Sequence, residues 1–386
     1  MKPNLLFDKD QFKLGFFAPN CSSGMAVTKV SERWVSSWEN NLKLARLADE
    51  AGIDFLLPIA RWIGYGGETD FHGSVLETMT WAAGLLASTE QISVVATIHT
   101  AANNPVVVAK QIATIDQISD GRAGLNIVAG WNKPEYEALG VTLPDDHETR
   151  YGYAEEWFQI VRKLWTEKDA FDWDGQYFHL KGVYSDPKPI HGVPPIINAA
   201  GSGQGREFAT RNANFLFTPA IDLDRSREEI KELKELASSK GREVDVLTFA
   251  MVVCRPTQKE ADEYLQYYAQ DNADWEAVDN LMRLQFAHAQ SFPHDLLALI
   301  RDRMAAGHGG FPLVGTPKKV AEGIAQLHEA GFGGTTLAFV DYAREFPYFR
   351  DEVLPLLEKR GIRKKPGASK RPGARPRKGF FGLGAR

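Results

Sequence analysis

The sequence predicts an α/β fold, a closed (β/α)8 barrel of the TIM type with insertions after strand 4 and near the last strands. Three observations lead to this prediction. Short apolar runs alternate with amphipathic stretches along most of the 386 residues, eight such strand–helix steps can be counted, and they are evenly spaced. Alternation of this kind gives parallel strands covered by helices, and eight units close into a barrel. An open doubly wound sheet is the alternative, but eight even units suit it less well.

The first half of the chain supplies four predicted strands, at residues 12–19, 53–58, 92–99 and 123–130. The helices that follow them are predicted at 37–52, 75–89, 104–119 and 147–166. In the first of these helices, Leu44, Leu47, Ala48 and Ala51 recur at the spacing of one helix face, and Gly52 marks its end.

The second half continues the alternation with strands at 194–201, 214–220, 244–254 and 335–340. Its helices are predicted at 206–213, 226–241, 258–272 and 316–332, with 344–361 closing the fold. Two stretches interrupt the pattern. Residues 169–192 carry a hairpin signal around Asp174-Gly175. Residues 275–312 form a long insertion, and long loops in compact domains are usually functional or mobile.

Composition is that of a globular protein, with 44 % apolar and 25 % charged residues. No apolar run approaches the roughly 20 residues that cross a bilayer, and the N-terminus lacks the apolar core of a secretory signal. Cys21 and Cys254 are far apart and show no metal-type spacing. We therefore expect a cytoplasmic protein without a disulfide framework or a membrane partner.

Charge divides the chain into two parts. Residues 359–386 hold 11 Lys or Arg and no acid, which leaves 34 basic and 50 acidic residues in 1–358. We expect a single barrel domain over 1–358 and a basic disordered tail over 359–386. A basic tail can contact anionic surfaces, but the acidic body argues against nucleic acid as the main partner.

Four motifs resemble the bacterial luciferase-like, flavin-dependent monooxygenases. They are IARWIGYGGETDF (59–71), KQIATIDQISDGRAGLNIVAGWNKPEYEALG (110–140), the pair Arg150-Tyr151, and AAGSGQGREFA (199–209). The resemblance covers nearly all of 12–358. It is nearest to the pyrimidine and dialkyl-sulfone branches of that family. GWNKPEYEALG (130–140) and GYGGETDF (64–71) favour the ring-opening branch, whereas CSSGMAVTK (21–29) looks more like the sulfone branch.

This resemblance implies FMN at the C-terminal ends of the barrel strands, reduced by a separate NAD(P)H:flavin reductase. It implies a flavin peroxide, formed with O₂, that oxygenates a small organic substrate, either a pyrimidine-type ring or an organosulfur compound. A homo-oligomer is implied as well. The alternative within the same fold is a deazaflavin-dependent oxidoreductase or a non-catalytic flavin-binding protein.

Asn126 stands inside an apolar strand, where a buried amide needs hydrogen-bond partners. The resemblance makes Thr97 and Asn126 the catalytic pair that lines the oxygen pocket, with donors that stabilise developing charge. The alternative is that Asn126 satisfies a bulge and Thr97 is only a strand former.

The resemblance also assigns cofactor-binding residues. They are Ala60, Arg61, Asn126, Glu135, Arg150, Tyr151 and Ser202. Arg150 and Tyr151 begin a helix and suit a phosphate, as does the glycine-rich turn at Ser202.

Each of these assignments has a simpler alternative. Arg61 could pair with Glu68 or Asp70 at the surface, Glu135 could cap a helix, and the glycine-rich turn could hold no ligand. The histidines lack ligand spacing, so no metal site is predicted.

Overall fold

The computed structural model describes residues 4–199, 203–285 and 294–364. Its centre is a closed barrel of eight parallel strands, because β9 pairs with both β8 and β11. The barrel strands, in spatial order, are β1 (Lys13–Phe17), β2 (Phe55–Leu57), β3 (Ser93–His99), β4 (Ala123–Val128), β7 (Ile196–Ala199), β8 (Phe215–Phe217), β9 (Asp245–Cys254) and β11 (Gly334–Ala338). The eight predicted strands and the predicted barrel are confirmed.

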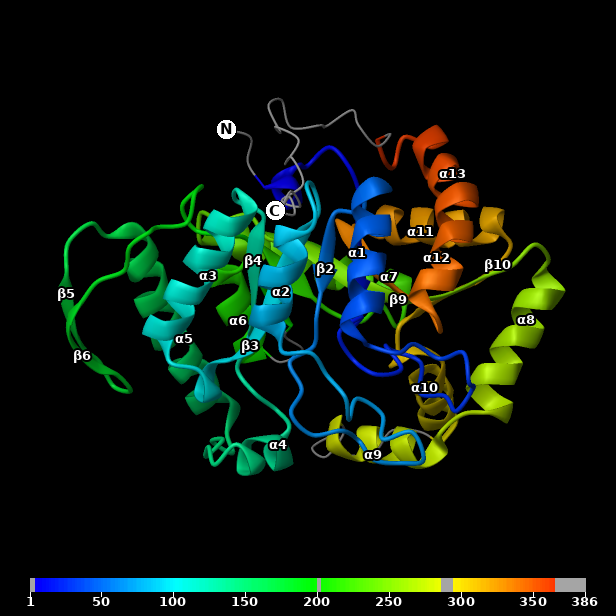
Figure 1. Cartoon of the computed structure of the whole chain (residues 1–386), viewed down its shortest axis with the longest axis horizontal. Helices are drawn as coiled ribbons and strands as arrows, with labels where there is room; N and C mark the ends of the chain where they lie inside the picture. The colour runs from blue at the N-terminus through cyan, green and yellow to red at the C-terminus, as the bar shows by residue number, and fades with distance from the viewer. Residues whose placement is uncertain (1–3, 200–202, 286–293, 365–386) are drawn as a thin grey trace, which may run out of the picture.

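Helices surround this barrel on its outer side (Figure 1). They are α1 (Trp38–Glu50), α2 (Thr78–Ala87), α3 (Pro105–Ser119), α5 (His147–Thr166), α6 (Gly203–Asn212), α7 (Leu223–Ser239), α8 (Gln258–Gln266), α11 (Pro317–Glu329), α12 (Tyr342–Glu352) and α13 (Leu354–Lys359). Short helical turns are η1 (Leu5–Phe7), η2 (Thr100–Ala102) and the π-helical η3 (Tyr267–Asp271). The predicted helices lie at these positions, with the 258–272 helix divided into α8 and η3.

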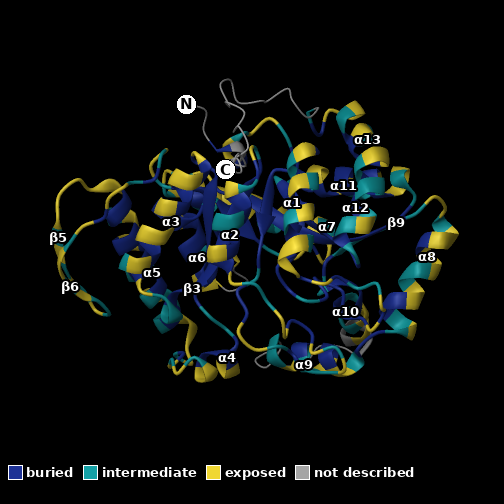
Figure 2. Ribbon diagram, in the orientation of Figure 1, coloured by how far each residue is buried: buried dark blue, intermediate teal, exposed yellow. Residues whose placement is uncertain are grey.

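Burial on both faces explains why the strands read as continuous apolar runs (Figure 2). The outward residues pack against the helices. The inward residues form a separate cluster that fills the barrel: Leu6, Phe55, Leu57, Val95, Ile197, Phe215, Phe217, Leu247 and Phe249. The lumen is therefore a packed core, so that ligands must bind at the strand ends.

The segment 169–192 contains the predicted hairpin, formed by β5 (Phe171–Asp174) and β6 (His179–Val183), which pair antiparallel. The segment 275–312 differs from the expected long loop. It contains α9 (Trp275–Gln285), α10 (His294–Gly307) and the start of a ninth sheet strand, β10 (Phe311–Gly315), parallel to the end of β9. Helix α9 and the short α4 (Lys133–Ala138) lie at the end of the barrel where the strands finish (Figure 1).

The described structure runs past residue 358, the predicted end of the body, as far as Lys364. The Arg363 guanidinium is buried and donates to Asp54 Oδ2, to Phe12 O and to Gly52 O at 2.6–2.7 Å. A basic residue that composition assigns to the tail thus closes the end of the barrel where the strands begin. The rest of the predicted tail lies outside the described residues.

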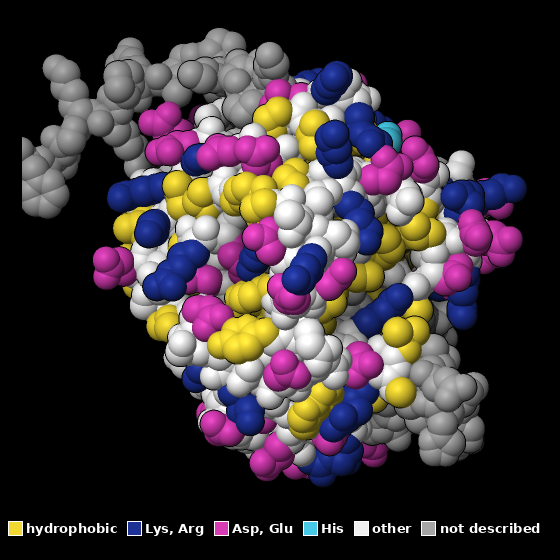
Figure 3. Space-filling view, turned by 90° about the vertical axis from the view of Figure 1, so that its right-hand side faces the viewer, with side chains coloured by type: hydrophobic (Ala, Val, Ile, Leu, Met, Phe, Trp, Pro, Cys, Tyr) yellow, Lys and Arg dark blue, Asp and Glu magenta, His cyan; other side chains and the backbone are white. Residues whose placement is uncertain are grey.

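Within the described part of the chain, no helix is long and apolar enough to cross a membrane. The flank seen in Figure 3 intersperses basic and acidic side chains with apolar ones, without one large area of a single charge.

Candidate active site

Thr97 and Asn126 lie opposite one another on the neighbouring strands β3 and β4, near the strand ends. Both side chains are buried. The Thr97 hydroxyl donates to Pro58 O at 2.6 Å and accepts from Asn126 Nδ2 at 3.1 Å. The register of β4 runs without a shift against both β3 and β7, so Asn126 does not occupy a bulge. The two predicted catalytic residues are therefore brought together. Because the single hydroxyl hydrogen of Thr97 is used on Pro58, the remaining donor of the pair is the second amide hydrogen of Asn126.

The amide oxygens at this end of the barrel lack partners. Asn126 Oδ1 and Asn198 Oδ1 are buried and accept no hydrogen bond from the described residues. Asn198 lies on β7 and donates through Nδ2 to Ile127 O at 2.8 Å, which fixes its orientation. Leaving such an acceptor buried and unmatched costs about 1–3 kcal/mol. Two acceptors on adjacent strands thus indicate that a ligand or water with hydrogen-bond donors completes the site.

Arg61 and Glu135 form a buried ion pair beside these strands. Arg61 Nη1 lies 2.9 Å from Glu135 Oε2, and the side chains are 4 % and 0 % exposed. Glu135 Oε1 accepts from Trp62 N at 2.7 Å. Arg61 is thus paired in the interior rather than with Glu68 or Asp70. Glu135 binds the Arg61 guanidinium and the Trp62 backbone rather than capping α4. Burial raises the pKa of Glu135, while the Arg61 cation opposes the rise.

The segment before this pair is held in place from β1. Asn20 follows β1 and exchanges two hydrogen bonds with the Ile59 backbone, at 3.0 Å and 2.8 Å. Ala60 is buried directly after it. The Arg61 guanidinium then lies 4.9 Å from the Tyr65 ring centroid and 5.3 Å from that of Trp131. Ala60 and Arg61 therefore lie at the exit of β2, with Arg61 between two aromatic rings.

His99 ends β3 next to the same carboxylate. Its Nδ1 lies 3.8 Å from Glu135 Oε2, and its ring stacks on Tyr136 at 5.4 Å between centroids. Burial, together with the Arg61 cation, lowers the pKa of His99 to about 3. His99 is thus neutral, and its contact with Glu135 is not an ion pair. His99 Nδ1 and Arg61 Nε add two further buried atoms without a described partner.

Arg150 and Tyr151 are the fourth and fifth residues of α5, so Arg150 ends its first turn and Tyr151 follows it. The Arg150 guanidinium donates to three backbone carbonyls, those of Gly130, Asp145 and Asp146, at 3.1–3.3 Å. It thereby ties the start of α5 to the exit of β4. The Tyr151 ring lies 5.8 Å from Phe208 of α6. Ser202 precedes α6 and lies outside the described residues.

The sequence reasoning missed a pair of histidines near this site. His72 is buried and His308 is half-buried, their rings are nearly parallel at 6.1 Å between centroids, and both backbones have positive φ, 59° and 57°. Non-glycine residues in this conformation are uncommon and concentrate at functional sites. Both histidines are flanked by glycine in the sequence, in FHG and GHGG, and this pattern could have pointed to their unusual backbone conformation.

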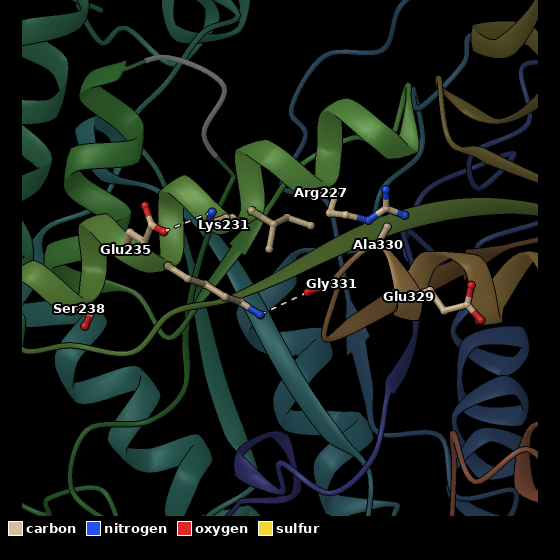
Figure 4. A pocket seen from close by; sticks show the side chains of 9 residues that line it. Arg227, Lys231, Glu235, Ser238, Glu329, Ala330 and Gly331 are labelled. Carbon is tan, nitrogen blue, oxygen red and sulfur yellow. Dashed lines mark hydrogen bonds and ion pairs between the residues drawn. The ribbon is translucent and has the colours of Figure 1, made fainter.

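A depression between α7 and α11 lies elsewhere and is not part of the site. It is lined by residues of α7 and by Glu329, Ala330 and Gly331 at the end of α11, outside the barrel, as Figure 4 shows. Its lysines are already engaged, Lys231 with Glu235 and Lys234 with Gly331 O and Asp245.

Comparison with known proteins supplies relatives along almost the whole chain. The family model described as luciferase-like monooxygenase matches residues 12–334. The pyrimidine monooxygenase RutA of Acinetobacter baylyi is 32 % identical over 354 residues, which cover 90 % of this chain and 95 % of the relative. An FMNH(2)-dependent dimethylsulfone monooxygenase of Pseudomonas fluorescens is 30 % identical over 353 residues, covering 90 % and 94 %.

A solved structure has the same fold. DmoA from Hyphomicrobium sulfonivorans superposes with a TM-score of 0.82 at 21 % identity, covering 92 % of this chain and 89 % of that one. At this identity the likeness concerns the fold alone.

Proposed function

The chain belongs to the luciferase-like monooxygenase family and is a flavin-dependent monooxygenase, and we propose that it oxygenates a small organic substrate with reduced FMN bound at the ends of β3 and β4. The observation that carries this proposal is the Thr97–Asn126 pair, with unmatched polar atoms around it. Relatives at 30 % and 32 % identity are named FMNH(2)-dependent and pyrimidine monooxygenases, which favours FMN over a deazaflavin.

The described residues fit such a cofactor. A reduced isoalloxazine ring has both N–H groups and carbonyl oxygens along its polar edge. Asn126 Oδ1 and Asn198 Oδ1 are free acceptors, and Arg61 Nε is a free donor, among the described residues. We assign the ring to Ala60, Arg61, Asn126 and Glu135, and the phosphate to Arg150, Tyr151 and Ser202. In this assignment Glu135 acts through Arg61 and the Trp62 backbone, which it orients.

Reduced FMN would supply the two electrons that activate O₂. The protein's contribution is to hold a donor where negative charge develops. Pro58 O fixes the Thr97 hydroxyl, whose lone pair fixes Asn126 Nδ2, so one amide hydrogen of Asn126 is oriented before any ligand arrives. A preoriented donor in a buried site stabilises developing charge without reorganisation. Because Thr97 and Asn126 are buried, water is also kept away from the position beside them where O₂ would react.

Replacement of Asn126 tests this role. We expect Asn126→Ala to lower substrate oxygenation by about 10²–10³-fold, the usual effect of removing one such donor. Thr97→Val should lower it in the same direction, because Asn126 Nδ2 loses its acceptor. The control is Thr114→Val on the exposed side of α3, whose hydroxyl bonds only its own helix. Unchanged oxygenation in Asn126→Ala would remove the basis of the proposal.

We further propose that a separate NAD(P)H:flavin reductase supplies the reduced FMN. Oxygenation of a substrate should be absent when the purified protein receives FMN and NADH alone. It should appear when an NADH:flavin reductase is added. Direct NADH oxidation by the purified protein would contradict a separate reductase.

The resemblance also supports a homo-oligomer. Light scattering of the purified chain should give a mass that is a multiple of the 43.0 kDa subunit. A monomer at micromolar concentration would contradict it.

A further inference from the structure

Helices α9 and α10, to which the proposed function gives no part, support the two aromatic rings that contact Arg61. The Arg61 guanidinium lies 4.9 Å from the Tyr65 ring centroid and 5.3 Å from that of Trp131. Tyr65 is a buried member of an apolar cluster, and Trp131 packs against the same cluster. Its other buried members, most of them on or beside α9 and α10, are Val27, Phe71, Ala273, Ala277, Val278, Leu281, Met304 and Ala305.

Tyr65 begins a closed loop that comprises residues 65–71. Tyr65 N donates to Phe71 O at 2.8 Å, and Phe71 N donates to Gly66 O at 3.1 Å. The Tyr65 ring also stacks on the Phe71 ring, with 5.9 Å between centroids. These contacts make the loop compact, so groups that hold it from outside also fix the Tyr65 ring.

Two side chains at α9 hold this loop. Asp274, directly before α9, is buried, and its Oδ2 accepts from Thr69 N at 2.7 Å and from the Thr69 hydroxyl at 2.8 Å. Its Oδ1 accepts from Ala277 N at 3.3 Å, so the same carboxylate also binds the first turn of α9. Asn280 Nδ2 donates to Tyr65 O at 3.0 Å. The loop is thus joined to α9 both at Thr69 and at Tyr65.

A glycine allows this close approach. Gly67 has a φ of +74°, and a Cβ there would overlap Asp274 and lie 2.8 Å from Ala277 Cβ. Gly66 has nearly the same φ, +68°, but a Cβ there would meet only Asn280 Nδ2, at the ordinary distance of 3.5 Å. Alanine at either position therefore has a similar backbone strain, but only at Gly67 does it also push the loop away from α9.

The orientation of Arg61 matters because one of its donors is unmatched. Nη1 is paired with Glu135 Oε2, whereas Nε is buried and has no partner among the described residues. The proposed function directs this Nε to the polar edge of FMN. The reduced ring can carry a negative charge that the oxidised ring lacks, and a nearby cation favours the charged form. An Arg61 held in place therefore favours reduced over oxidised FMN.

We propose that Asp274 and Asn280 are positioning residues of the flavin site, which hold the Tyr65 loop on α9 so that Arg61 keeps its Nε turned toward the reduced ring. This inference rests on the proposed function and gives α9 a part in it. Both residues act through Tyr65 and Arg61.

The test measures the Kd of the purified protein for oxidised FMN and, without oxygen, for reduced FMN. The readout is the ratio of the two Kd values, because a variant that is only less stable loses affinity for both forms by the same factor. The wild type should bind reduced FMN more tightly. Asp274→Asn leaves one oxygen where two are used, and it should lower this preference about fivefold, the size of one cation–π contact. Asn280→Asp removes the donor to Tyr65 O and should lower it in the same direction.

Matched controls separate this role from general stability. Asp49→Asn makes the same change in a carboxylate that also holds a loop, through three backbone N–H groups of residues 90–92, but at the end of the barrel where the strands begin. It should keep the preference of the wild type. Gly67→Ala should lower the preference, and Gly66→Ala, which has similar strain without the overlap, should lower it less.

The outcomes distinguish two levels of failure. A wild type that binds no FMN contradicts the proposed function itself, and this inference with it. If FMN binds, equal affinity of the wild type for both forms overturns only the positioning role. The same holds for an unchanged preference in both Asp274→Asn and Asn280→Asp, or for an equal fall in Asp49→Asn and Asp274→Asn. Urea unfolding without FMN checks that each variant is folded, and Asn280→Asp, at a half-buried position, decides the question if Asp274→Asn is not.

Discussion

At the scale of single residues, the buried Arg61–Glu135 pair is the most consequential arrangement. Both charged groups are removed from water, and the attraction between them offsets the cost of burying each charge. Because the pair is buried and Glu135 lies 3.8 Å from His99 at the end of β3, it helps to orient the site and is not a surface contact.

Glu135→Leu should therefore destabilise the protein by about 3–5 kcal/mol, because Arg61 stays buried without its counter-charge. The double variant Arg61→Met/Glu135→Leu should recover most of that loss. Urea unfolding of the two single variants and the double variant measures the coupling. Additive losses would show that the two side chains do not act as a pair.

Buried histidines predict a loss of stability in acid. The pKa of His99 and that of His308 are both lowered to about 3, chiefly by burial, from an ordinary value of 6.5. Between these pH values the unfolded chain binds protons that the folded chain does not, so stability falls as pH falls below 6.5. Each histidine should cost about 2 kcal/mol between pH 7 and pH 5.

His99→Phe keeps the stack on Tyr136 and removes one titrating group. Urea unfolding at pH 7 and pH 5 should show a pH-dependent loss about 2 kcal/mol smaller than in the wild type. An identical loss in variant and wild type would mean that His99 titrates normally in the folded protein.

At the scale of elements, the β5–β6 hairpin depends on one carboxylate of α5. Glu156 accepts from Trp173 Nε1, Tyr177 N and Phe178 N, each at 3.0 Å. A two-stranded sheet has few hydrogen bonds of its own to hold it in place. The Glu156 carboxylate adds three that attach the hairpin to α5.

Glu156→Ala should loosen the hairpin, because two backbone N–H groups lose their acceptor at a local cost of about 1–3 kcal/mol. Hydrogen exchange at Tyr177 and Phe178 should accelerate, while FMN affinity stays unchanged. Glu148→Ala, at an exposed position of the same helix, is the control. Exchange rates that match the wild type would show that the hairpin is held by other contacts.

The barrel could be predicted from the sequence because its strands are buried on both faces and its helices are amphipathic, patterns that are local. The 275–312 segment could not, because its two helices and β10 depend on pairing with β9 and on contacts with distant loops. Within the site, Thr97 and Asn126 were predicted as a pair. The Arg61–Glu135 contact and the His72–Gly24 contact were not, since they join residues 74 and 48 positions apart.

At the scale of the whole molecule, the two ends of the barrel differ in role: the end where the strands finish carries the site, and the end where they begin closes the fold. One end carries the unmatched polar atoms of the site. At the other end, Leu6 lies in the lumen cluster and Arg363 binds Asp54, so the chain's early and late segments are joined.

Truncation distinguishes the tail from this closure. Deleting residues 365–386 should leave stability and FMN affinity unchanged. Deleting 362–386 should destabilise the fold by about 3–5 kcal/mol, because Asp54 stays buried without Arg363. Thermal and urea unfolding of the two truncated chains provide the comparison. Equal stability of the two would mean that Arg363 contributes nothing to the closure.

The central claim is that the flavin ring lies at the ends of β3 and β4, and a crystal structure of the protein with FMN tests it most directly. The account predicts the ring within hydrogen-bond distance of the Asn126 side chain, with Arg61 at its polar edge and the phosphate near the start of α5. A ring bound elsewhere, or Asn126 matched only by water beside a bound flavin, would contradict it.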